Sequence, residues 1–95
     1  MIEYRLSRRA EADLIGIAHY SSETFGIERA RVYRDGLIDM FDRLAANPEL
    51  GAAFPLRPGV RKHIYQSHAI FYRVSADRVS ILRILHQGMD VLRHL

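Results

Sequence analysis

Two runs near the end of the chain decide the fold: AIFYRV at residues 69–74 and VSILRILH at residues 79–86. Both runs are rich in β-branched, aromatic and aliphatic side chains, and the short segment 75–78 separates them. This pattern predicts a β-hairpin, because such side chains fit a pleated, half-buried surface. Arg83 interrupts the second run, and an arginine is costly to bury unless it is paired. We therefore look for function at Arg83 and at the polar cluster that follows the second strand.

Upstream of these runs, the spacing of apolar residues predicts a strand and two helices. Residues 2–6 alternate in polarity, as a half-buried strand does. Ser7 then offers a cap for a helix that ends at Gly26. Apolar residues recur at steps of three or four over residues 30–44, and Pro48 ends this second helix. Two helices joined by so short a link form an antiparallel helical hairpin.

The segment 47–59 holds all three prolines and predicts a loop. Strand-like sequence resumes at residues 60–65. The resulting order, β-α-α-β-β-β, predicts an α+β fold: a single domain over residues 1–95, with the helical hairpin on one face of a small antiparallel sheet. The small residues Ala10, Ala18 and Gly36 are expected to let the two helices approach closely.

Length and composition restrict the class of protein. A chain of 95 residues allows one domain with a modest core. No stretch approaches the roughly 20 apolar residues of a membrane span, and the start lacks the pattern of a secretory signal. The chain has no cysteine, which fits a reducing compartment. We expect a cytoplasmic protein.

Arginine dominates the basic residues. The net charge is only +3 and the isoelectric point about 9.7, yet Lys62 is the single lysine among 14 basic residues. Arginine suits bidentate contacts with carboxylates and phosphates, so this bias points to an acidic protein partner or a nucleic acid. GC-rich coding explains the same bias equally well.

Four residues form the candidate site: Arg61, Arg83, His86 and Asp90. Arg61 and Arg83 stand in strands that both neighbour the 69–74 strand, so their guanidinium groups are expected to share a face of the sheet. Such a pair can bind a phosphate or a carboxylate. The structural alternative is that each arginine pairs with an internal acid. That alternative is favoured for Arg83 and is as good as the functional one for Arg61.

His86 and Asp90 allow a metal site or a structural contact. Asp90 follows His86 by four positions, but no third ligand is spaced with them, so a metal site is not expected. A hydrogen bond between the two residues, which would shape the C-terminal turn, is favoured. The sequence contains no phosphate-binding loop, dinucleotide fingerprint or nucleophile motif, and we expect no cofactor.

Along its whole length the chain resembles ParE-type toxins of the RelE/ParE superfamily. The resemblance is carried by YRLS at residues 4–7, Phe25-Gly26, Val60-Arg61, and above all LRILH at residues 82–86 followed by Met89-Asp90. It implies a toxin of a bacterial type II toxin-antitoxin module, in a hetero-oligomer with a cognate antitoxin whose disordered C-terminal segment folds on the toxin. Members closest to ParE poison DNA gyrase by trapping its complex with cleaved DNA. RelE-like members instead cut mRNA on the ribosome.

The ribonuclease alternative can be tested by comparing this sequence with the residues that RelE-like ribonucleases use. RelE-like ribonucleases place lysines in the loop before the second strand, arginines on the sheet, and a tyrosine or histidine near the C-terminus. Arg61 matches one of these arginines, but the loop has no lysine, and Gln87 and Arg93 stand where an arginine and a tyrosine are expected. His86 and His94 keep the alternative open.

We therefore expect a gyrase inhibitor without catalytic residues, with Arg61 as the direct target contact and with no sequence-specific binding to nucleic acid. The alternatives are a ribosome-dependent mRNA endoribonuclease of the RelE type and an arginine-rich RNA-binding module.

Overall fold

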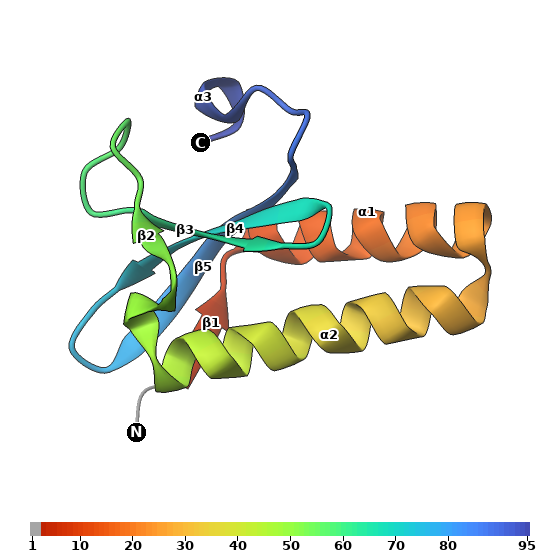
Figure 1. Cartoon of the computed structure of the whole chain (residues 1–95), viewed down its shortest axis with the longest axis horizontal. Helices are drawn as coiled ribbons and strands as arrows, with labels where there is room; N and C mark the ends of the chain where they lie inside the picture. The colour runs from red at the N-terminus through yellow and green to blue at the C-terminus, as the bar shows by residue number, and fades with distance from the viewer. Residues whose placement is uncertain (1–2) are drawn as a thin grey trace.

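The structure, a computed structural model, describes residues 3–95 and consists of a five-stranded sheet with helices on both sides (Figure 1). The strands lie in the spatial order β1-β5-β4-β3-β2. In chain order the elements are β1 (Glu3–Leu6), α1 (Arg8–Phe25), α2 (Ile27–Ala46), the 3-10 helix η1 (Pro48–Leu50), β2 (Ala52–Ala53), β3 (Arg61–Tyr65), β4 (His68–Val74), β5 (Arg78–His86) and α3 (Val91–His94).

The predicted strands are present, but the sheet is mixed. β3, β4 and β5 form the expected antiparallel meander, whereas β1 pairs with β5 in parallel. The helical hairpin and the meander separate β1 from β5 along the chain, and a parallel pair needs such a long connection. The two-residue strand β2 lies within the predicted loop and adds an edge to β3. Ile2, which the sequence places in the first strand, lies outside the described residues.

Local signals at the helix ends act as predicted. The Ser7 hydroxyl accepts a hydrogen bond of 3.0 Å from the Ala10 N–H at the start of α1. Gly26 ends α1 with a φ of 92°, in the left-handed region that favours glycine. α2 ends just before Asn47 and Pro48, because proline cannot continue a helix.

The main core lies between the hairpin and the sheet. It buries Leu37, Phe41 and Leu44 of α2 against Ile70, Tyr72, Ile81 and Ile84 of β4 and β5. Gly36 does not serve the contact between α1 and α2 that we expected. A Cβ atom there would overlap the hydroxyl end of Tyr65, so Gly36 makes room for a side chain of β3.

The opposite face of the sheet carries a second, smaller apolar cluster. Phe71 and Leu85 are buried there with Val60 and Ala69. Phe54 from the loop after β2, together with Val91 and Leu95 at the C-terminal end, packs against them. The short helix α3 therefore lies across the sheet from the hairpin (Figure 1). The sequence analysis did not predict this second layer.

A β-bulge at Leu82 sets the direction of the side chains at the end of β5. Tyr72 pairs with Ile81 but Phe71 pairs with Arg83, so Leu82 has no partner on β4. The extra residue lets Ile81 and Ile84 both face the hairpin although they are three positions apart. Every side chain after the bulge is moved to the face opposite the one that an unbulged hairpin would give it.

Candidate functional site

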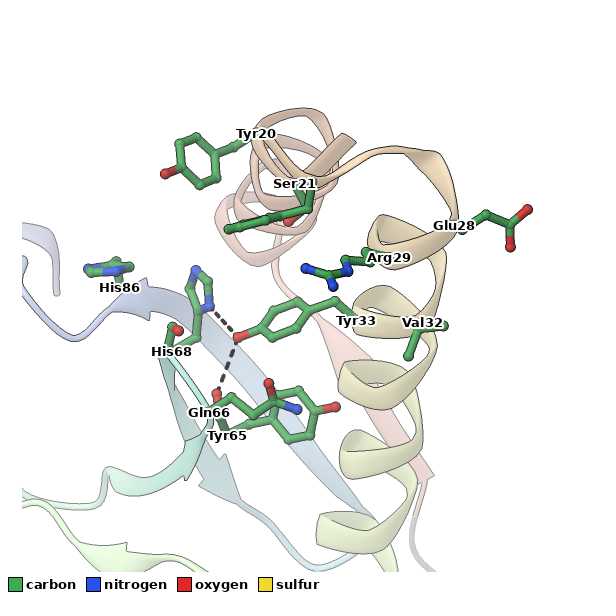
Figure 2. Close-up of a pocket in the computed structure, with 12 residues that line it drawn as sticks. Tyr20, Ser21, Glu28, Arg29, Val32, Tyr33, Tyr65, Gln66, His68 and His86 are labelled. Carbon is green, nitrogen blue, oxygen red and sulfur yellow. Dashed lines mark hydrogen bonds between the residues drawn. The ribbon is translucent and has the colours of Figure 1, made fainter. Parts of the chain in front are cut away.

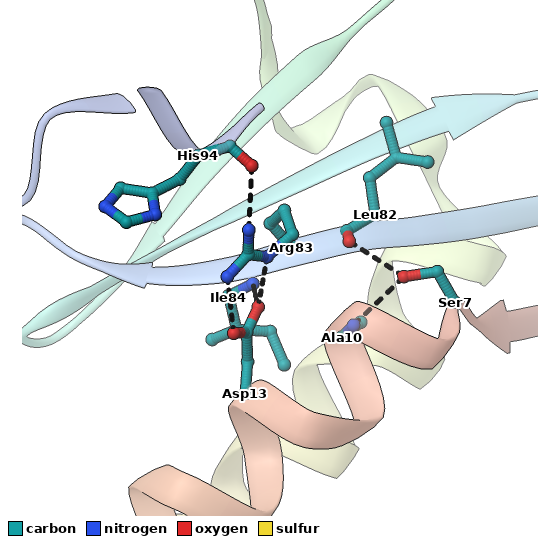
Figure 3. Close-up of polar contacts among 7 residues, drawn as sticks. All are labelled: Ser7, Ala10, Asp13, Leu82, Arg83, Ile84 and His94. Atoms are coloured by element: carbon teal, nitrogen blue, oxygen red, sulfur yellow. Dashed lines mark hydrogen bonds and ion pairs between the residues drawn. The ribbon is translucent and has the colours of Figure 1, made fainter. Parts of the chain in front are cut away.

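Arg83 is neutralised inside the fold. Its Nε and Nη2 atoms donate to the two carboxylate oxygens of Asp13 at 2.7 and 2.8 Å, and its Nη1 donates to the His94 carbonyl at 2.7 Å (Figure 3). The side chains of Arg83 and Asp13 are only 12% and 14% exposed. The hydrogen bond to Asp13 raises the pKa of Arg83. This is the internal ion pair that the structural alternative expected.

The position of Asp13 follows from the short length of β1. β1 ends at Leu6, opposite Ile81, while β5 continues to pair with β4 as far as His86. Beyond Leu6, side chains of α1 and of its cap form hydrogen bonds with backbone groups of β5 that have no strand partner on this edge. The Ser7 hydroxyl donates to the Leu82 carbonyl at 2.8 Å, and Asp13 accepts the Ile84 N–H at 2.9 Å. Backbone polar groups that lose a strand partner need such substitutes.

Arg61 lies in a different environment. It is partly buried, and its Nη2 donates to the Gly51 carbonyl at 2.5 Å. Among residues 3–95, its buried Nε has no hydrogen-bond partner, and no carboxylate lies within 4.0 Å of its guanidinium group. A pocket of about 510 Å³ opens beside it, and Glu49 is among the residues that line this pocket. A partly buried cation without a counter-ion suits the binding of an external anionic group.

Arg61 and Arg83 do not share a face of the sheet, so that expectation is wrong. Arg61 pairs with Tyr72, whose side chain lies in the core under the hairpin. Arg83 pairs with Phe71, whose side chain lies in the cluster on the opposite face. The bulge at Leu82 is the physical reason, since without it Arg83 would pair with Ile70 on the face of Arg61.

His86 and Asp90 do not contact each other through a hydrogen bond or ion pair in the described part of the chain. The Nδ1 atom of His86 instead accepts the Gly88 N–H at 3.1 Å, and Asp90 is the exposed residue before α3. His86 thus shapes the turn through Gly88. The four predicted site residues do not form one connected cluster.

His86 belongs to a second site, a groove between the hairpin and the β3–β4 turn (Figure 2). We call it the hairpin groove; its volume is about 600 Å³. Three large side chains on its wall are exposed: Tyr20 by 64%, Phe25 by 55% and Val32 by 72%. Monomers rarely leave such side chains together in a hollow without a partner.

A histidine pair closes the sheet end of the hairpin groove. His68 and His86 lie opposite each other on β4 and β5, with ring centroids 5.6 Å apart and planes at 89°. The Tyr33 hydroxyl lies 2.6 Å from Nδ1 of His68 and 3.3 Å from the Tyr65 carbonyl, to which it donates (Figure 2). The Tyr33 hydroxyl thus links the His68 ring on β4 to the backbone of β3.

Burial controls the charge of this cluster. It lowers the pKa of His68, and the neighbouring His86 lowers it further. Burial also raises the pKa of Tyr33. Near neutral pH, His68 is therefore uncharged and Tyr33 keeps its proton.

His68, Tyr33 and Arg29, which also lines the groove, were not predicted as site residues. For His68, the bulge in β5 hid the signal. In a regular hairpin His68 would lie opposite Leu85, and His86 would face the other side of the sheet. Only the register with Leu82 bulged brings the two histidines together.

Residues 4–91 match the family described as the ParE toxin of the type II toxin-antitoxin system parDE. The chain belongs to the ParE toxin family. It is 44% identical over 96 residues to Toxin ParE1 of Caulobacter vibrioides, covering all of this chain and 99% of that protein. It is 42% identical over 94 residues to Toxin ParE1 of Mycobacterium tuberculosis, covering 97% and 96%. The resemblance found in the sequence is confirmed, and the chain is a type II toxin of the ParE family.

Solved structures agree with this ParE-type fold. The chromosomal ParDE toxin-antitoxin system of P. aeruginosa gives a TM-score of 0.79 at 27% identity, covering 90% of this chain and 96% of that one. The toxin-antitoxin complex RelBE2 of M. tuberculosis gives a TM-score of 0.68 at 20% identity, covering 90% and 98%. The latter likeness concerns the fold alone. The predicted α+β class with a helical hairpin on a small sheet is confirmed.

Residues 3–95 contain no group of three or more histidine, cysteine, aspartate or glutamate side chains placed to hold a metal ion. None of the helices described for these residues has the length and apolar character needed to cross a membrane.

Proposed function

We propose that this ParE-family toxin inhibits DNA gyrase by trapping the complex of gyrase with cleaved DNA. Gyrase is the target that the resemblance to ParE-type toxins implies. The observation that carries the proposal is the state of Arg61, a partly buried cation that has no acidic partner among the described residues and lies beside an open pocket. A bound carboxylate or phosphate of the target would supply the missing counter-ion.

The toxin acts in this proposal by binding and without catalysis. The cationic groups of a RelE-like ribonuclease have to meet at the scissile phosphate. Here Arg83 is held by Asp13 and faces away from Arg61, and the loop before β3 has no lysine. These features favour binding of a protein target. Because gyrase acts on the chromosome, we place the toxin in the cytoplasm.

We further propose that an antitoxin neutralises the toxin by folding a disordered segment onto it. One helix of that segment would occupy the hairpin groove, where Tyr20, Phe25 and Val32 are exposed. β2 pairs only with Arg61 and Lys62, so the edge of β3 from His63 onward is open to an added strand. The similarity to the P. aeruginosa ParDE system supports a partner of this kind.

Induction of the toxin in cells without antitoxin tests the proposal. We expect filamentation and accumulation of double-strand breaks, because trapped gyrase leaves cleaved DNA. Co-expression of the product of the adjacent gene should restore growth. Arrest of translation with undamaged chromosomes would overturn the gyrase target.

The second candidate is ribosome-dependent cleavage of mRNA. The observation in its favour is the pair His68 and His86, two imidazole rings side by side that could exchange protons with a substrate. Incubation of the purified toxin with ribosome-bound mRNA decides between the two. Intact mRNA is expected, and codon-phased cuts that disappear in Arg61→Ala or His68→Asn would favour the ribonuclease. Salt-sensitive RNA binding without growth arrest would indicate an RNA-binding module instead.

A further inference from the structure

Three basic side chains line the hairpin groove, and no carboxylate of the described residues points toward them. His68 and His86 close its sheet end, and Arg29 points into it from α2 (Figure 2). No carboxylate of the described residues lies within 4.0 Å of the Arg29 guanidinium group. Glu28 is on the rim, but its side chain points away from the groove (Figure 2). The site therefore has a permanent cation and two titratable rings without a counter-ion.

The remaining wall of the groove indicates what kind of partner brings the anion. Tyr20, Phe25 and Val32 offer exposed apolar surface next to the charged end. A nucleic acid would require contacts from several lysines or arginines to its phosphates, and Arg29 is the sole residue of either type among the described residues that line the groove. An acidic, amphipathic peptide matches both halves of the groove, with apolar anchors beside a carboxylate.

We infer that His68, His86 and Arg29 form an anion site that binds a carboxylate of the antitoxin segment and takes up a proton as it does so. This inference rests on the proposed antitoxin in the hairpin groove and adds the group that it presents there. A carboxylate forms charge-assisted hydrogen bonds with both guanidinium and imidazolium groups. Its charge favours the protonated imidazole and so reverses the effect of burial on His68.

The direction of the pH dependence follows from the groups that face His68. They are Tyr20 and Asp13 from α1, Arg29 and Tyr33 from α2, Tyr65 from β3 and His86 from β5. Glu28 on α2 points away from the groove. Burial and His86 lower the pKa of His68, while Asp13, already held by Arg83, raises it. The free toxin therefore has a neutral His68 near neutral pH. Affinity for the acidic segment should rise as the pH falls and should level off below the pKa of His68 in the free toxin.

Calorimetric titration of the toxin with the product of the adjacent gene measures how many protons are taken up on binding. It is carried out in buffers of different ionisation enthalpy between about pH 5.5 and 8. We expect net proton uptake, and a gain of about tenfold in affinity for each unit by which binding raises the histidine pKa. NMR of the histidine Cε1–H groups should show the pKa of His68 rising in the complex. Arg29→Gln should weaken binding at every pH and leave the proton uptake in place.

The double variant His68→Asn with His86→Gln should bind without proton uptake. The asparagine amide can form a hydrogen bond with Tyr33 in place of Nδ1, as donor or as acceptor, so the fold is expected to persist, and thermal unfolding checks this. His19→Gln is the matched control, because His19 is exposed on α1 and pairs only with Glu23; it should keep the uptake of the unmodified toxin.

Four results would overturn the inference. Unchanged proton uptake in the double variant, or binding that does not depend on pH, would remove the anion site and leave the antitoxin proposal intact. Failure to form any complex at any pH would instead contradict the proposed antitoxin itself. Movement of the His68 and His86 resonances with a short single-stranded RNA, but not with the antitoxin, would assign the site to nucleic acid.

Discussion

Asp13 and Arg83 stand 70 positions apart in the chain and form a two-bond ion pair that ties α1 to the edge of β5. The same carboxylate accepts the Ile84 N–H, and the same guanidinium group donates to the His94 carbonyl. The pair therefore joins the layer of the hairpin to the C-terminal segment on the other face of the sheet (Figure 3). Arg83 therefore has the structural role that the sequence favoured for it.

Removal of one partner should be strongly destabilising. Asp13→Ala leaves a nearly buried guanidinium group without a counter-ion and Ile84 without an acceptor, and we expect a loss of about 3 kcal/mol in the free energy of unfolding. Urea denaturation followed by circular dichroism measures it. The exposed pair Asp77–Arg78, at 3.9 Å, is the control, and Asp77→Ala should cost less than about 0.5 kcal/mol. Equal losses for the two variants would contradict the structural role of Asp13.

Two glycine-to-alanine changes should have opposite effects. Tyr72 donates from its hydroxyl to the Pro48 carbonyl at 2.6 Å and accepts the Gly51 N–H at 2.9 Å. A Cβ atom on Gly51 would overlap this hydroxyl and lie 2.8 Å from the Lys62 carbonyl oxygen, so Gly51→Ala should destabilise by about 1–3 kcal/mol. Gly16 in α1 has open space around it, and Gly16→Ala should stabilise by about 1 kcal/mol. Thermal unfolding checks both signs.

The hairpin and both helices follow from signals that act locally. Ser7 caps the start of α1, Gly26 ends it, and Pro48 prevents α2 from continuing. Each effect acts within a few residues, so the sequence alone places the helix ends. The parallel pairing of β1 and the apolar layer under α3 depend on contacts between distant segments. No local pattern encodes them.

One residue explains most of what the sequence could not reveal about the site. Leu82 is an ordinary strand residue, without a glycine or proline beside it to mark a bulge. Its extra position moves Arg83 away from the face of Arg61 and brings His86 opposite His68. Candidate residues after position 82 were therefore assigned from the wrong register, while Arg61, before the bulged strand, was not affected.

The stability of the toxin should fall as the pH decreases below about 6.5. Burial lowers the pKa of His68 in the folded state, so the unfolded chain binds more protons between that pKa and the ordinary histidine value. The stability contribution of neutral His68 is complete above this window and is lost as the pH falls through it. Urea denaturation across this range should show a weaker pH dependence for His68→Asn than for His19→Gln. An identical pH dependence of stability in the two variants would contradict the lowered pKa of His68.

Arg61 should be required for toxicity but not for folding. Charge-assisted hydrogen bonds contribute about 1.5–3 kcal/mol, so Arg61→Ala should raise the toxin concentration for half-maximal gyrase inhibition by at least about tenfold. Circular dichroism should show an unchanged fold. Arg78→Ala, at a partly exposed arginine at the start of β5, is the control and should keep full potency. Full activity of the Arg61 variant would exclude it as the target contact.

Incubation of purified toxin with DNA gyrase, supercoiled plasmid and ATP is the most direct test of the proposed target. We predict loss of supercoiling together with linear plasmid that is covalently bound to gyrase, and suppression of both effects by the product of the adjacent gene. Gyrase that remains fully active, without cleaved complexes, at toxin concentrations that arrest growth would contradict the proposal.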